Sequence, residues 1–111
     1  KEFDLDFPQE LEEHLQLFSV YFGTDKGSEL RNHVKSLLSK PKTCMTLTQK
    51  SSRIIETVRE KYQIKAILSD VDMTKLNEYD KVKASELLEN LNDCFDDALN
   101  NYVSDIQLEL Q

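Results

Sequence analysis

The sequence predicts an all-α protein that folds as a compact bundle of four to five helices with a long C-terminal helix. Its 111 residues include only two glycines and two prolines, fewer than strands joined by tight turns require. Apolar residues instead recur at spacings of three and four, the period of one helix face. This length is typical of one domain, so we expect a single helical domain over residues 8–111, preceded by an extended arm over residues 1–7.

The first helix is expected to begin at Pro8, because proline is tolerated in a first helical turn, where its missing N–H is not needed. We expect it to end at Gly23, with residues 23–27 as a loop. Its apolar face comprises Leu11, Leu15, Phe18 and Phe22.

The second helix is expected to begin after Ser28, a residue type that favours the N-cap position. It should end in residues 39–42, which include Pro41. Its predicted apolar face comprises Leu30, Val34, Leu37 and Leu38.

A third helix is expected to begin at Thr43 or Thr46. Its predicted inward side chains are Leu47, Ile54, Ile55, Val58 and Tyr62. Apolar residues within 64–68 indicate one more short helix before residues 70–72.

The last helix gives the strongest pattern, because no glycine or proline interrupts it from about Asp80 onward. Its predicted core positions are Ala84, Leu88, Leu91, Phe95, Ala98, Tyr102 and Ile106. Candidates for a second apolar stripe, which a partner helix could cover, are Leu87, Leu99, Val103, Leu108 and Leu110.

Charge is unevenly distributed within the net charge of −7. Residues 1–27 carry two basic and seven acidic groups, and residues 66–111 carry three and eleven. Residues 28–65 carry nine basic and three acidic groups. We call their cations the basic centre: Arg31, Lys35, Lys40, Lys42, Lys50, Arg53, Arg59, Lys61 and Lys65.

The chain lacks the motifs of catalysis. Its two glycines cannot form a phosphate-binding loop. Cys44 and Cys94 have no Cys-x-x-Cys spacing and no histidine near them in the sequence, so no zinc ligand set is predicted. His14 and His33 are interpreted as structural or solvated. We therefore expect no enzyme, no catalytic residue, no cofactor and no metal. The chain contains no run of 18 apolar residues, so we predict no membrane span.

Three interpretations of the basic centre remain open. Nucleic-acid binding is disfavoured, because Tyr62 is the only aromatic residue in residues 28–65 and the acidic flanks repel a polyanion. Docking of an acidic disordered peptide is the second, since cations steer such a partner and apolar contacts hold it. The third is an ordinary solvated surface that pairs with acidic helices of the same domain.

Residues 37–65 also suggest a relationship. They combine a helix-ending Leu38, a short loop with threonine and a helix with Gln49 and Lys50. The other matching positions are Thr43, Met45, Ile55, Thr57, Val58 and Lys65. This stretch resembles the helical domains related to the N-terminal domain of elongation factor TFIIS, and most of all those of the integrase-binding type found in lens-epithelium-derived growth factor.

The resemblance implies a scaffold domain of transcription or chromatin assemblies that captures short acidic motifs at its interhelical loops. The partner-binding residues it indicates, together with the basic centre, are Asp25, Lys50, Lys61, Ile64, Lys65 and Ala66.

We thus expect a non-enzymatic protein-interaction module of nuclear or cytosolic location with reduced cysteines. One alternative is a structural subunit domain whose last helix mediates permanent homo- or hetero-oligomerisation. Another is a secreted helical signalling ligand, which would require a Cys44–Cys94 disulfide.

Overall fold

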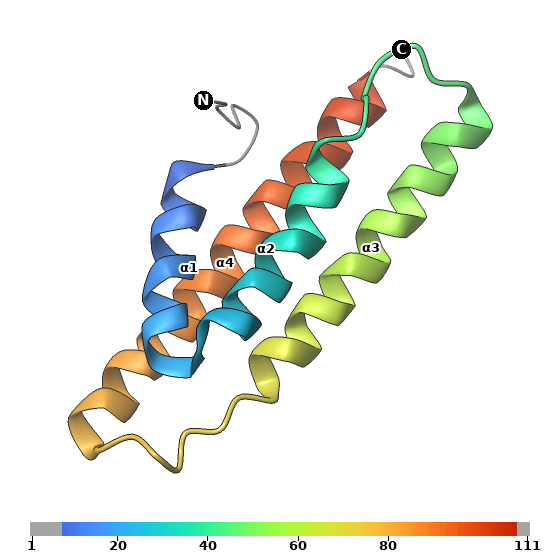
Figure 1. Ribbon diagram of the computed structural model, residues 1–111. Coiled ribbons are helices and arrows are strands. Elements are labelled where there is room, and N and C mark those ends of the chain that lie inside the picture. The colour runs from blue at the N-terminus through green and yellow to red at the C-terminus, as the bar shows by residue number, and fades with distance from the viewer. Residues whose placement is uncertain (1–7, 109–111) are drawn as a thin grey trace.

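Four helices, each antiparallel to the next along the chain, make up the bundle (Figure 1). The computed structural model describes residues 8–108, in which there is no strand. The helices are α1 (Gln9–Phe22), α2 (Thr24–Leu38), α3 (Leu47–Ser69) and α4 (Glu78–Leu108). The predicted all-α bundle with a long C-terminal helix is confirmed. The arm expected over residues 1–7 lies outside the described residues.

α4 lies at the centre of the arrangement and contacts the other three helices. α2 contacts both α1 and α3, whereas α1 and α3, as far as they are described, do not contact each other. Figure 1 shows them on opposite sides of α2 and α4. α3 therefore packs through only one side, and its outer side has no helix against it.

The hydrophobic core confirms most of the predicted faces of α1, α2 and α4. It comprises Leu11, Leu15, Phe18, Leu30, Val34, Leu37, Leu38, Ile64, Leu68, Leu87, Leu91, Phe95, Leu99, Tyr102 and Ile106. Full burial of one such side chain contributes about 1.5–3 kcal/mol to folding. None of the helices in residues 8–108 is both long and apolar enough to cross a membrane.

The predicted second stripe on the last helix is wrong at two positions. Leu87 is 5% exposed and Leu99 is fully buried, so both belong to the core. α4 packs against three neighbours, and its buried arc is therefore wider than one stripe. Val103 is half-buried. The Leu108 side chain and Leu110 lie outside the described part of the chain.

The reversal between α1 and α2 uses one residue, so the predicted loop over residues 23–27 and the Ser28 cap are wrong. Gly23 has φ 104° and ψ 147°, a conformation essentially restricted to glycine. α2 begins directly at Thr24. Gly27 lies inside α2 against α1, where an added Cβ would be 2.0 Å from the Ser19 Oγ. The two nearby glycines that predicted a loop therefore have separate roles. Gly23 forms the turn, and Gly27 allows the close contact between α2 and α1.

α3 begins with a capping box, as one of the two predicted starts allows. The Gln49 N–H donates to the Thr46 hydroxyl at 3.1 Å, and the Thr46 N–H donates to the Gln49 side-chain oxygen at 2.9 Å. These bonds satisfy donors that a helix N-terminus leaves unpaired. The helix then continues without a break to Ser69. The short separate helix expected over residues 64–68 is therefore the end of α3, and residues 8–108 form four helices.

The predicted inward face of α3 is wrong. Leu47, Ile55, Val58 and Tyr62 are exposed, whereas Ile54 is half-buried. The buried positions are Lys50, Thr57, Ile64 and Leu68. α3 therefore turns a mixed polar and apolar side toward α2 and α4 and leaves apolar side chains on the outside.

Candidate partner-binding surface

Four exposed apolar side chains form a row on α3, and we call Leu47, Ile55, Val58 and Tyr62 the outer stripe. Their exposed fractions are 67%, 58%, 44% and 71%. Ile55, Val58 and Tyr62 are spaced by three and four residues, so they are neighbours on one helix face. Adjacent exposed apolar side chains such as Ile55, Val58 and Tyr62 are typical of an interaction site, whereas single exposed apolar residues are not.

Positive charge flanks the outer stripe. Arg59 and Lys65 are both exposed on α3. The two carboxylates within α3 turn instead toward α2 and the residues that follow it. Glu56 forms an ion pair with Lys40, and Glu60 Oε1 lies 2.7 Å from Nδ1 of His33. The outer stripe therefore combines apolar and basic groups, while the acidic groups of the same helix lie elsewhere.

Hydrogen bonds to α4 explain why α3 is oriented this way. Arg53 Nη1 donates to the Tyr102 hydroxyl at 2.9 Å and to the Pro41 carbonyl oxygen at 2.8 Å. About two turns later, Lys61 Nζ donates to Asn100 Oδ1 at 3.2 Å. These bonds hold a polar side of α3 against the bundle, and the opposite side faces solvent.

The predicted partner-binding residues separate into a buried and an exposed group. Ile64 is 1% exposed and belongs to the core, and Lys50 is 5% exposed. Neither side chain presents a surface to a partner in this arrangement. Lys61 is half-buried and bonded to Asn100.

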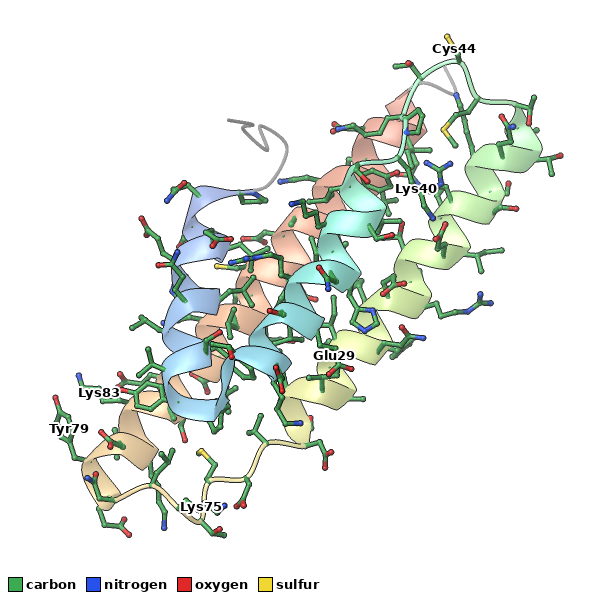
Figure 2. All side chains as sticks on the ribbon, in the orientation of Figure 1. Glu29, Lys40, Cys44, Lys75, Tyr79 and Lys83 are labelled. Carbon is green, nitrogen blue, oxygen red and sulfur yellow. The ribbon has the colours of Figure 1, made fainter. Side chains whose placement is uncertain are left out.

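The predicted partner-binding residues that are exposed lie at the end of α3 and at the start of α2. Lys65 and Ala66 are exposed one turn beyond Tyr62, and Asp25 is exposed in the first turn of α2. An open hollow of about 440 Å³ lies where the start of α2 meets the end of α3. Glu29, labelled in Figure 2, lies on its α2 side. The hollow is lined by Lys26, Glu29, Ala66, Ile67, Ser69 and Asp70. The structure thus brings the first turn of α2 near Ala66.

Several cations of the basic centre pair with acids of the same bundle. Arg31 pairs with Glu12 of α1, and Lys42 Nζ lies 2.9 Å from Asp105 Oδ2 of α4. Lys40 pairs with Glu56, and Arg53 is bonded to Tyr102. The basic centre therefore does not form one continuous surface. Arg59 and Lys65 are the cations most closely associated with the outer stripe.

Both cysteines are free thiols in this structure. Cys44 is in the α2–α3 loop with φ 58°, and its side chain points away from the helices (Figure 2). Cys94 is half-buried on α4, with Sγ 3.9 Å from Nδ1 of His14. Burial raises the pKa of the Cys94 thiol, and the nearby carboxylates of Glu10, Asp97 and Asp93 raise it further.

Comparison of the chain with protein families, curated proteins and solved structures finds no match.

Proposed function

We propose that this domain is a non-enzymatic docking module whose outer stripe binds short acidic segments with aliphatic or aromatic anchors. The observation that supports it is the row of exposed apolar side chains on a helix face that also exposes Arg59 and Lys65. Apolar anchors would pack on Ile55, Val58 and Tyr62. Acidic groups beside the anchors would lie near the two cations, which speeds encounter more than it strengthens the complex.

The affinity of one such segment is expected to be low. Complete burial of an aliphatic or aromatic side chain supplies about 1.5–3 kcal/mol, and the outer stripe side chains are already partly covered. Ordering a disordered peptide costs about 2–5 kcal/mol. A single motif should therefore bind with a dissociation constant of roughly 0.1–1 mM. This constant should increase with salt concentration, because the cations beside the outer stripe are exposed.

The cellular setting proposed for this docking is a nuclear transcription or chromatin assembly. The ground for that setting is the resemblance of residues 37–65 to the TFIIS-related helical domains. The docking chemistry does not depend on it, since the outer stripe and its cations are features of α3 alone.

A peptide-display selection tests the docking proposal. The wild-type domain is compared with an outer-stripe variant, Ile55→Ser, Val58→Ser and Tyr62→Ser. The matched control is Tyr79→Ser with Val82→Ser, which removes two exposed apolar side chains from the first turns of α4. Tyr79 is labelled in Figure 2. Circular dichroism establishes that all three proteins are helical before selection.

The expected result is enrichment by the wild type of acidic peptides with bulky apolar residues. These peptides should bind the wild type and the control roughly tenfold more tightly than the outer-stripe variant, a difference of about 1.4 kcal/mol. Equal binding to all three proteins, or enrichment of basic peptides, would contradict the proposal.

Sedimentation separates docking from the alternative role in permanent oligomerisation. A monomeric wild type agrees with transient docking. A stable dimer that the outer-stripe variant converts to a monomer would assign the same surface to self-association and replace the docking proposal.

A further inference from the structure

Three potential metal ligands converge where the start of α1 meets the middle of α4. Glu10 and His14 are one turn apart on α1, and Cys94 projects from α4. A carboxylate oxygen, an imidazole nitrogen and the sulfur lie within 4.8 Å of one another. Because 80 positions separate His14 from Cys94, the sequence pattern gives no indication of this cluster, and no metal ligands were predicted there.

The distances are close to those of a tetrahedral zinc site. Zinc bonds of about 2.0–2.3 Å to nitrogen, oxygen and sulfur place adjacent ligand atoms roughly 3.3–3.6 Å apart. Cys94 Sγ and His14 Nδ1 are 3.9 Å apart. Side-chain rotation of Glu10, which is exposed in the first turn of α1, can close the remaining gap.

The contacts of His14 show which ring nitrogen faces the sulfur. His14 Nδ1 lies 3.9 Å from Cys94 Sγ and 2.8 Å from the Glu10 carbonyl oxygen. Because a carbonyl oxygen can only accept, Nδ1 carries the ring proton while that bond is formed. Coordination through Nδ1 would move this proton to Nε2 and replace the bond to the carbonyl with a bond to the metal.

The surroundings of the sulfur favour a cation. Asp93 and Asp97 flank Cys94 on α4, and Glu10 faces it from α1. Three carboxylates near one half-buried thiol form a negative environment that a divalent ion would neutralise. Carboxylate, imidazole and thiolate together suit a metal of intermediate softness.

We propose that Glu10, His14 and Cys94 bind one zinc ion that links α1 to α4. Zinc–oxygen, zinc–nitrogen and zinc–sulfur bonds form, the thiol S–H bond breaks, and its proton passes to the buffer. A water molecule completes four-coordination. No oxidation or reduction takes place. The ion joins two helices that already pack against each other, so its binding stabilises the bundle.

Titration of the reduced, metal-free chain with Zn²⁺ and with Co²⁺ tests the site. Cobalt is the spectroscopic probe, because a thiolate ligand produces a near-ultraviolet charge-transfer band that oxygen and nitrogen ligands do not. Site variants are Glu10→Gln, His14→Gln and Cys94→Ser. Matched controls are Glu13→Gln, an exposed carboxylate in the same helix, His33→Gln and Cys44→Asn, since asparagine tolerates the positive φ of that position.

The expected result is one zinc per chain in the wild type and the controls, with a raised melting temperature. Each site variant should bind zinc roughly tenfold or more weakly, and Cys94→Ser should lose the cobalt charge-transfer band. An unchanged band in Cys94→Ser, or its loss in Cys44→Asn, would overturn the proposal.

Alkylation of the wild type gives an answer even if a variant fails to fold. Mass spectrometry follows the reaction of each cysteine with iodoacetamide. Zinc should slow alkylation of Cys94 and leave that of Cys44 unchanged. The proposal would be overturned if zinc slowed alkylation of the two thiols equally, or if zinc did not change the alkylation rate of Cys94. These readouts do not involve α3, so they are independent of the docking proposal.

Discussion

Arg53 of α3 and Tyr102 of α4 form a direct link between two helices, a hydrogen bond of 2.9 Å from the guanidinium to the phenol hydroxyl. Tyr102 is 1% exposed, so its ring fills the core while its hydroxyl reaches α3. The same guanidinium nitrogen holds the Pro41 carbonyl oxygen, which ties in the loop before α3. This pair therefore fixes the position of α3 relative to both α4 and the loop.

Tyr102→Phe tests that link. The substitution keeps the ring in the core and removes the acceptor of the Arg53 hydrogen bond. We expect the free energy of unfolding to fall by about 1 kcal/mol, the typical net contribution of a hydrogen bond. Urea denaturation measures the change. Tyr79→Phe, at a 69% exposed position, is the control and should have no effect. Equal effects of the two substitutions would show that the Arg53 bond adds nothing to stability.

Gly23→Ala tests the single-residue turn between α1 and α2. Its φ of 104° and ψ of 147° disfavour any residue with a Cβ, although an added Cβ would meet no atom within 4 Å. The loss of stability should therefore come from the backbone alone and amount to about 2 kcal/mol. Ser28→Ala, exposed within α2, is the control. Thermal unfolding measures the stability of both variants. If Gly23→Ala unfolded at the wild-type temperature, the turn would adopt another backbone conformation without a loss of stability.

Gly27→Leu tests the close approach of α2 to α1. An added Cβ would be 2.0 Å from the Ser19 Oγ and 3.3 Å from the Ser19 Cβ, so a larger side chain must push the helices apart. We expect destabilisation of about 2 kcal/mol by overpacking. Ser28→Leu, one position along on the exposed side, should be nearly neutral. Chemical denaturation compares the two, and similar stabilities would refute a tight contact at Gly27.

The raised pKa of Cys94 predicts a pH dependence of stability in the metal-free chain. The folded state binds the thiol proton more tightly than the unfolded state does. Its contribution is fully present below the ordinary thiol pKa, 9.0 for the unfolded chain, and is lost as pH rises through the higher folded pKa. The stability of the wild type should therefore decline more steeply above about pH 9 than that of Cys94→Ser.

Denaturation of both proteins between pH 8 and pH 10.5 measures this difference, and Cys44→Asn serves as the control with the wild-type slope. Parallel curves for all three proteins would show that the environment of Cys94 does not favour the protonated thiol.

The sequence was sufficient to predict the helices and most of the core, because α1, α2 and α4 each bury an apolar face. α3 differs for a physical reason. Its inward positions are Lys50, Ile54, Thr57, Lys61, Ile64 and Leu68, spaced by four and three residues throughout. Half of them are polar, so a search for an apolar face selects Ile55, Val58 and Tyr62 instead. The regular spacing of three and four residues could have indicated the inward side of α3. It is recognised only if polar residues are also accepted as inward positions.

The candidate sites were predictable to different degrees. Lys65 and Ala66 lie beside the outer stripe. Ile64, which the resemblance assigned to a pocket, is instead buried in the core. The cluster of Glu10, His14 and Cys94 depends on the packing of α1 on α4. Contacts between residues so distant in the chain leave no spacing pattern to read.

The hydrogen-bonded side of α3 has a consequence for how the fold is specified. A rotational setting of α3 in which Ile55, Val58 and Tyr62 face the core would also cover three apolar side chains, as the observed setting does with Ile54, Ile64 and Leu68. Apolar contact is nondirectional, so it distinguishes poorly between settings that bury similar areas. The bonds of Arg53 to Tyr102, Lys61 to Asn100 and His33 to Glu60 require particular directions. Directional polar contacts thus select the rotation of this helix, and the apolar surface they leave outside becomes available for recognition.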